Sequence, residues 1–303
     1  FSSALLRAVG DTKRPLYCLA AAGAINVVLN LVFVIGFSMS VAGVALATII
    51  SQTVSALMVT VLLMKEEGPL HLDLRHLGFH KGALIQILKI GLPAGMQSVI
   101  FNISNVLIQS SINSFGAVAV AGNTAAANVE GFVYISMNSL YQTTLSFTSQ
   151  NLGAKQYRRV DGILVRCMIL VILIGVVLGQ GAYRLGDPLL HIYSQDPEVI
   201  AYGIQRFSVV SVTYFLCGMM DVGSGVVRGL GYSIMPMLVS MVGACVFRII
   251  WVYTVFASVG TLESLYVSYP ISWILSTAAH IVCYYIIRKK PFKATLEAKA
   301  AAA

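Results

Sequence analysis

Between Pro15 and Met64 the chain carries no Asp, Glu, Lys or Arg over fifty consecutive residues. A single helix of that length would be roughly 75 Å long, more than twice the ~30 Å hydrocarbon core of a bilayer. The run must therefore contain two spans, and the segment from Gly36 to Ser40 supplies a turn between them. Hydrophobic residues make up 57% of the chain and charged residues only 11%, which excludes an ordinary soluble domain.

The same reasoning divides the rest of the chain into apolar runs of membrane-spanning length. We expect eight spans, at about 15–36, 41–64, 89–114, 118–147, 161–182, 199–228, 233–258 and 264–287. Only helices and closed barrels satisfy the backbone in lipid, and continuous apolar runs of this length do not fit barrel strands. The predicted fold class is therefore an all-α integral membrane protein.

The charge of the connecting segments alternates along the chain. One set is rich in Lys and Arg, at 13–14, 65–81, 155–159, 228 and 288–293, whereas the other set holds Arg184 with four acids. By the positive-inside rule the basic set is cytoplasmic, and both ends of the sequence lie on that side. The net charge of +8 is thereby explained by orientation, and we expect no nucleic-acid partner.

An internal repeat connects two distant parts of the chain. Arg7, Gly10 and Pro15 recur as Arg228, Gly231 and Pro236, with the Arg-to-Gly spacing of three and the Gly-to-Pro spacing of five conserved between the two copies. Each copy follows a span, and each proline opens the next one, where its missing N–H costs least. Two such copies favour a duplicated carrier built from two lobes.

The motifs of the chain resemble those of the multidrug and toxic compound extrusion (MATE) family. The resemblance rests on the stretch from Leu6 to Pro15, on Asn26 and Asn30, and on Gly91-x-Pro93. It extends to the Gly43–Gln52 segment and to Gln150-Asn151-x-Gly153-Ala154, so it covers the chain to about residue 287.

The resemblance implies twelve helices in two six-helix lobes that face a central cavity, of which this sequence would hold helices five to twelve. Residues 1–64 would then end the N-terminal lobe, 65–88 would be a cytoplasmic interlobe linker, 89–287 the C-terminal lobe and 288–303 a basic cytoplasmic tail. Asn26 and Asn30 match the pattern of helix five, where we expect them to pack within the first lobe.

Two polar stripes lie on consecutive predicted spans. Asn102 and Asn105 belong to one, whereas Asn123, Glu130, Tyr134 and Asn138 recur at helical spacing on the next. Such stripes should face the bundle interior or a wet cavity, and the alternative is that they only hold the helices together through hydrogen bonds. Glu130 lies near mid-depth, where an ionisable residue costs about 2.5–3.5 kcal/mol, and this favours a role as cation-coupling site.

Two further charged residues lie within the spans. Asp221 shares a helical face with Tyr214 and Arg228, and it is the second cation-coupling candidate, with neutralisation by Arg228 as an equally weighted alternative. Arg248 lies too deep to reach the interface easily, and we expect it to pair with Glu130 or Asp221 as charge partner or gate. The predicted substrate cavity comprises Asn102, Asn105, Asn123, Tyr134, Asn138 and Tyr214.

The resemblance also shows where this chain departs from its family. Many bacterial relatives carry an acid early in helix seven, but the span from Ile90 to Ser114 contains none. Relatives also carry an acid in helix ten, and Asp221 falls about one turn nearer the cytoplasm than that position. Another subgroup relies on an acid in helix one, which lies outside this sequence.

The resemblance implies export of small organic, often cationic compounds driven by inward H+ or Na+, and our leading hypothesis is a secondary antiporter of this kind. The sequence contains no phosphate-binding GxxxxGK[ST] loop and no HExxH motif, and we expect neither enzymatic activity nor a cofactor other than the coupling ion. We expect a monomer in the bacterial inner membrane. Two alternatives stay open: a flippase for lipid-linked oligosaccharides or polysaccharides, and a membrane scaffold or channel subunit.

Overall fold

The computed structural model describes residues 2–67, 70–73 and 78–300, with the backbone alone from residue 290 onward. The chain forms two compact units, Phe1–His80 and Lys81–Ala303, and each is described by itself. In the ranges that the structure describes, all regular elements are helices, so the predicted all-α class is confirmed. Parts of the predicted linker and tail (residues 68–69, 74–77 and 301–303) lie outside the described residues.

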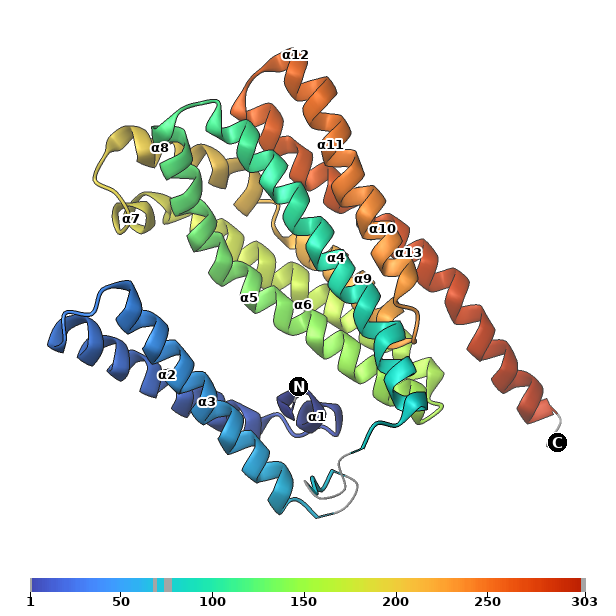
Figure 1. Ribbon diagram of the computed structural model, residues 1–303. Coiled ribbons are helices and arrows are strands. Elements are labelled where there is room, and N and C mark those ends of the chain that lie inside the picture. The colour runs from blue at the N-terminus through green and yellow to red at the C-terminus, as the bar shows by residue number, and fades with distance from the viewer. Residues whose placement is uncertain (1, 68–69, 74–77, 301–303) are drawn as a thin grey trace. The chain divides into compact units, whose positions relative to one another are not determined.

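The N-terminal unit is a helical hairpin preceded by a short helix (Figure 1). Helix α1 spans Ser2–Ala8, α2 spans Lys13–Leu31 and continues as the π-helical turn η1 (Val32–Gly36), and α3 spans Val41–Lys65. Leu6, Cys18, Val59 and Leu63 form its small buried core. Most of the apolar side chains of α2 and α3 are exposed, which suits a surface that faces hydrocarbon.

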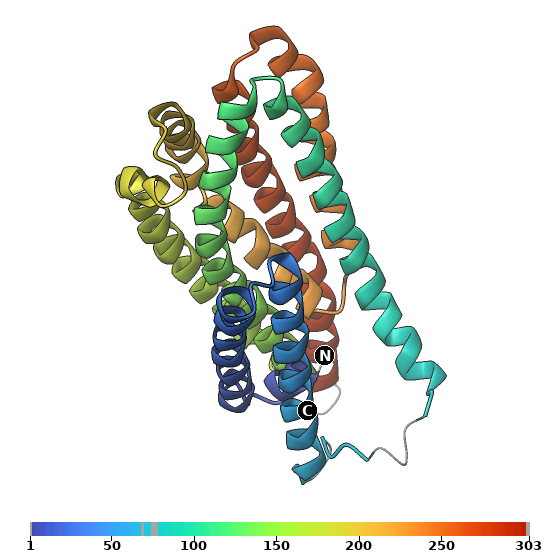
Figure 2. The same cartoon turned by 60° about the vertical axis from the view of Figure 1, so that its left-hand side comes forward.

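The C-terminal unit is a helical bundle. Its elements are α4 (Lys81–Asn113), α5 (Ala117–Gly153), α6 (Tyr157–Arg184), α7 (Gly186–His191), α8 (Pro197–Arg206), η3 (Phe207–Ser211), α9 (Phe215–Gly229), α10 (Ile234–Ser240), η4 (Met241–Val246), α11 (Phe247–Trp251), η5 (Val252–Phe256), α12 (Ala257–Val259) and α13 (Leu262–Ala300). Helix α4 runs along the continuous stretch α10–α12 on one flank of the bundle (Figure 2).

Each of the eight predicted spans corresponds to a helical stretch of this structure. Among the described residues, six helices are long and apolar enough to cross a membrane, and the α8–η3 and α9 pair, bent by 44°, makes a seventh. The eighth predicted span is α5, a 37-residue helix that contains Asn123 and Glu130 and is less apolar than the others. The count of eight therefore holds only approximately.

The ends of two elements differ from the expected boundaries. Helix α4 begins at Lys81, inside the range predicted as linker, and α13 continues to Ala300, into the range predicted as tail. Six of the seven residues from 294 to 300 are Ala, Leu, Glu or Lys, which are strong helix formers, and they extend the preceding helix to Ala300.

Glycines bring α5, α6 and the broken α8–α9 span into close contact. A Cβ added at Gly179 on α6 would lie 2.2 Å from the carbonyl oxygen of Ser211, and one added at Gly122 on α5 would lie 2.4 Å from that of Val199. Small residues at helix crossings allow this approach in membrane proteins. The contact at Ser211 lies at the bend of the broken span, directly before Tyr214 and α9.

Candidate functional site

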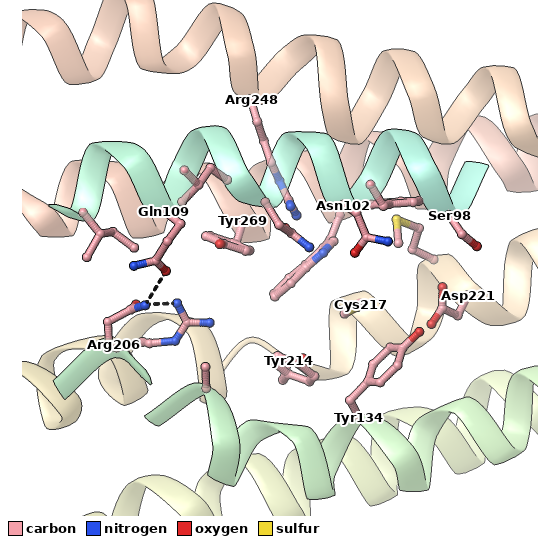
Figure 3. A pocket seen from close by; sticks show the side chains of 18 residues that line it. Ser98, Asn102, Gln109, Tyr134, Arg206, Tyr214, Cys217, Asp221, Arg248 and Tyr269 are labelled. Carbon is pink, nitrogen blue, oxygen red and sulfur yellow. Dashed lines mark hydrogen bonds between the residues drawn. The ribbon is translucent and has the colours of Figure 1, made fainter. Parts of the chain in front are cut away.

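A pocket of about 550 Å³ lies inside the C-terminal unit, and Figure 3 shows the side chains that line it. The walls come from α4, α5, the broken α8–α9 span, α11 and α13. Polar side chains of α4 and α5 line it together with Tyr214, directly before α9, and with Tyr269 and Trp273 of α13. The arrangement combines hydrogen-bonding, charged and aromatic groups in one cavity, as small-molecule sites do.

The two polar stripes predicted from the sequence meet at this pocket. Seven predicted site residues line it: Asn102, Asn105, Asn123, Tyr134, Tyr214, Asp221 and Arg248. Glu130 and Asn138 are not among its lining residues. The Asn138 amide lies one turn from Tyr134 and donates to its hydroxyl at 3.5 Å.

Glu130 is paired with an arginine that the sequence analysis did not single out. Arg206 Nη2 lies 2.6 Å from Glu130 Oε2 and its Nε 3.1 Å from the same oxygen. Ser211 Oγ donates to Glu130 Oε1 at 3.0 Å. The expected pairing of Arg248 with Glu130 is therefore wrong, because Arg206 already satisfies this buried carboxylate.

Asn123 extends the ion pair into a network across the bundle. Its Oδ1 accepts hydrogen bonds from Arg206 Nη1 at 2.8 Å and from the Tyr266 hydroxyl at 3.3 Å. Its Nδ2 donates to Gln109 Oε1 at 3.1 Å, which links α5 to α4. A buried polar network with each member bonded fixes the relative rotation of the helices that carry it.

Arg248 lies in an aromatic environment instead of beside a carboxylate. Its guanidinium carbon lies 4.3 Å from the centroid of the Tyr269 ring and 5.8 Å from that of Trp273. Nε donates to Ser272 Oγ at 2.9 Å. In the part of the chain that the structure describes, Arg248 makes no ion pair, so its expected pairing with Asp221 is also wrong.

Asp221 lines the same pocket from α9. Its Oδ2 is buried and has no hydrogen-bond partner among the described residues. Arg228, the alternative neutralising partner, directs its terminal nitrogens elsewhere: Nη1 donates to the Tyr141 hydroxyl, and Nη2 donates to Gln97 Oε1 at 2.6 Å. Figure 3 shows the carboxylate beside Tyr134. A carboxylate oxygen so placed can accept a proton, a metal cation or an organic cation.

A signal for the Glu130–Arg206 pair exists in the sequence. Glu130 lies about 20 Å along α5 and Arg206 about 14 Å along α8, and both helices begin on the same side of the bundle. A mid-depth acid needs a cation at comparable depth, and Arg206 meets that condition. Arg248 meets it as well, about 17 Å before the end of α12 at Val259, so depth alone does not choose between the two arginines. The stretch from Pro197 to Arg206 is amphipathic and lies at the start of an otherwise apolar span. Its arginine therefore looks like a residue of a polar helix face and not like a buried charge.

The two copies of the repeated motif adopt the same local structure. Gly10 and Gly231 have φ values of 94° and 89°, and each N–H bonds the carbonyl of the arginine three residues before it. In both copies the next N–H, of Asp11 or Tyr232, reaches a carbonyl five residues back. The following proline is in each case the third residue of the next helix, α2 or α10.

The helix-five asparagines connect the two long helices of the N-terminal unit. Asn26 Nδ2 on α2 donates to Ser51 Oγ on α3 at 3.1 Å, and Asn30 Nδ2 donates to Asn26 Oδ1 at 3.0 Å.

Across residues 2–67, 70–73 and 78–289, no group of three His, Cys, Asp or Glu side chains is arranged to hold a metal ion.

Comparison with known proteins places this architecture in a family. The family model described as MatE matches residues 93–254, which is more than half of the chain. The chain belongs to the MATE family. The resemblance deduced from its motifs is thereby confirmed.

Curated relatives of this MATE family chain carry names that refer to drug resistance. It is 27% identical over 243 residues to the probable multidrug resistance protein YoeA of Bacillus subtilis, covering 78% of this chain and 52% of that protein. It is 26% identical over 253 residues to the probable multidrug resistance protein NorM of Thermotoga maritima, covering 79% and 52%. The chain spans about half the length of the curated relatives that it matches.

Solved MATE structures share the fold. An outward-facing multidrug resistance MATE family transporter of the MOP superfamily superposes with a TM-score of 0.87 at 17% identity, covering 96% of this chain and 66% of that one. The Vibrio cholerae MATE transporter VcmN in its bent form gives 0.82 at 19% identity, covering 94% and 65%. At this identity the likeness establishes the fold alone.

Proposed function

We propose that the protein exports small organic compounds from the cell, as a secondary antiporter driven by inward movement of H+ or Na+. The proposal is supported by the family, by the names of its relatives and by a pocket that combines aromatic walls with charged groups. The protein would act as a monomer in the bacterial inner membrane, with both ends of this sequence in the cytoplasm. The proposal involves transport alone and no enzymatic step.

The single observation that carries the proposal is the position of Asp221. This carboxylate lines the pocket and holds an unpartnered oxygen, whereas Glu130 is already neutralised by Arg206. Both remain candidates for coupling, and we rank Asp221 first because a coupling site must load and unload its cation. Tyr134 and Tyr214 would offer ring faces to an organic cation beside this carboxylate.

Coupling requires that the cation and the drug favour opposite-facing states of the carrier. A ligand shifts a conformational equilibrium only through its differential affinity for the two states. In the proposed cycle, drug binding beside Asp221 and cation binding to Asp221 exclude each other. Each gradient-driven loading of the carboxylate would then release the drug outside.

The experiment measures ethidium uptake into everted membrane vesicles under an imposed H+ or Na+ gradient. We compare Asp221→Asn and Glu130→Gln with Asp187→Asn, a control at an exposed acid outside the pocket. Asp221→Asn should abolish gradient-driven uptake at unchanged protein level, and the control should retain it. Unchanged transport and ion dependence in both Asp221→Asn and Glu130→Gln would remove these carboxylates from the mechanism.

A second candidate function is the flipping of a lipid-linked oligosaccharide or polysaccharide. One observation favours it: two arginines, Arg206 and Arg248, line the pocket, and cations would hold a pyrophosphate linkage. A MOP superfamily transporter from Pyrococcus furiosus, described as having a binding pocket of reverse polarity, shares the fold (TM-score 0.84, 18% identity, covering 96% of this chain and 65% of that one). Complementation of a flippase-deficient strain, without any drug efflux, would favour this candidate.

A further inference from the structure

Arg248 is a buried cation whose charge no carboxylate balances in the described part of the chain. The side chain is 3% exposed, and its Nε donates to Ser272 Oγ at 2.9 Å. The terminal nitrogens have no hydrogen-bond partner among the described residues, and they are not fully enclosed by protein atoms. Figure 3 shows the side chain pointing from α11 into the pocket. The donors of Arg248 are thus open to the cavity.

A guanidinium at this depth is stable only with suitable partners. Tyr269 and Trp273 contribute their ring faces, and both lie within cation–π distance. Aromatic faces leave the in-plane N–H donors unused, and these donors form a fork that matches a carboxylate. A planar anion with two oxygens would therefore pair with both donors.

The two arginines of the pocket differ in whether a carboxylate of the protein already balances their charge. Arg206 is held by Glu130 and Asn123, so its charge is already balanced within the protein. One free guanidinium balances one negative charge, which fits a monovalent carboxylate better than a pyrophosphate. Asp221 adds a free negative group elsewhere in the same cavity, beside Tyr134 in Figure 3.

Part of the lining that these two charged groups share is apolar and aromatic. Tyr214 and Trp273 make an edge-to-face contact with centroids 5.4 Å apart, and Cys217 and Met220 also line the cavity. Flat aromatic bodies pack well against such surfaces. The pocket thus presents, in one volume of about 550 Å³, a free cation, a free anion and an aromatic wall.

We propose that Arg248 is an anion-recognition residue, and that the pocket takes amphiphilic zwitterions whose carboxylate pairs with Arg248 while their aromatic body lies against Trp273 and Tyr214. A cationic group of the same compound would lie toward Asp221. The inference rests on the proposed function, because it names the substrate class of that transporter's pocket.

The test uses two dyes that differ in a single charge. Rhodamine B joins a xanthenium cation to one free carboxylate, and its ethyl ester keeps the cation but loses the anion. Binding of each dye to the purified protein in lipid nanodiscs is measured by fluorescence anisotropy, without any ion gradient. Because the ester is more apolar, burial alone would favour the ester.

The wild-type protein should bind rhodamine B about 10-fold more tightly than the ester. Arg248→Gln should remove this preference by weakening rhodamine B about 10-fold, with less than about 2-fold change for the ester. Arg248→Lys keeps the charge but loses the fork, and it should keep part of the preference. The control Arg166→Gln removes an exposed arginine outside this pocket and should keep the full preference.

Two results would overturn the inference: equal binding of both dyes by the wild-type protein, or equal weakening of both dyes by Arg248→Gln. Equal binding by the wild-type protein overturns the inference even if Arg248→Gln fails to fold, and Arg248→Lys then serves as the second variant. A different result would contradict the proposed function: neither dye would be transported under an ion gradient, although the binding preference for rhodamine B persisted.

Discussion

Arg206 on α8 and Glu130 on α5 form a buried ion pair, with 2.6 Å between Arg206 Nη2 and Glu130 Oε2. The same guanidinium donates to Asn123, and Ser211 donates to the free oxygen of the carboxylate. Both charged groups are therefore bonded on several sides. This pair joins the C-terminal end of α8, in the first half of the broken span, to α5 directly beside the pocket, and we expect it to hold the pocket wall in place.

The first prediction concerns the contribution of this ion pair to the free energy of unfolding. Glu130→Leu and Arg206→Met should each destabilise the protein by about 3–5 kcal/mol, because each leaves one buried charge without its partner. The double variant should cost no more than either single variant, since it removes both charges and keeps the packing volume. Reversible unfolding in sodium dodecyl sulfate measures the three free energies of unfolding.

Strictly additive losses in the double variant would contradict the pairing. A matched reference is Arg248→Met, which removes a buried arginine without an ion-pair partner among the described residues. Combined with Glu130→Leu, it should give an additive loss, because Arg248 and Glu130 do not contact each other.

The second prediction concerns the glycine of the repeated motif. Gly231 has a φ of 89°, a left-handed conformation that costs an L-residue about 1–2 kcal/mol. Gly231→Ala should therefore lower stability by about that amount, and Gly10→Ala, at φ 94°, should behave in the same way. Gly162→Ala is the control: it lies inside α6 with open space around its Cβ position and should be neutral or stabilising. Thermal unfolding checks all three, and an equal response at Gly231 and Gly162 would contradict the argument.

Much of this fold could be predicted from the sequence because lipid imposes strong rules. The uncharged run from Pro15 to Met64 requires two spans, and the structure turns between Gly36 and Val41. The spacing of Asn102, Asn105 and Asn123 places them on interior faces, and all three line the pocket. These features depend on helix periodicity and on the length of a span, which are local properties of the sequence.

The charge pairing could not be predicted with the same rules. Which arginine meets Glu130 depends on the rotation and depth of helices far apart in the chain, and periodicity does not fix either. Arg206 is the last residue of α8 and is followed by a π-helical turn and a bend in the span, which a regular helical period does not predict. Arg248 comes from α11 on another side of the pocket, where aromatic rings surround it.

A third prediction concerns pH and lies outside the spans. Arg14 donates hydrogen bonds to Asp11 and Glu66, and these bonds hold the pKa of both carboxyl groups below their usual values. A carboxyl whose pKa is lowered on folding stabilises the fold above its unfolded pKa, and this contribution is lost as the pH falls through the folded pKa. The contact should therefore weaken below about pH 4.5.

The expected loss is small, because solvent screens an ion pair whose arginine is 43% exposed. Between about pH 6 and about pH 3, the melting temperature of the wild-type protein should fall more than that of Arg14→Gln, which lacks the contact from the outset. Lys13→Gln removes the neighbouring positive charge and should follow the wild-type curve. Identical curves for the wild-type protein and Arg14→Gln would contradict this prediction.

The final prediction concerns the close approach of α6 to the bend at Ser211. A Cβ at position 179 would lie 2.2 Å from the Ser211 carbonyl oxygen, so Gly179→Ala requires the backbone to move and should destabilise the protein by about 1–3 kcal/mol. Gly181→Ala, two residues further along the same helix, meets no atom within 4 Å and serves as the control. Because Ser211 Oγ also bonds Glu130, the shift at Gly179→Ala should reach the pocket and weaken dye binding there as well. Reduced stability with unchanged dye binding would show that the bend and the pocket are mechanically independent.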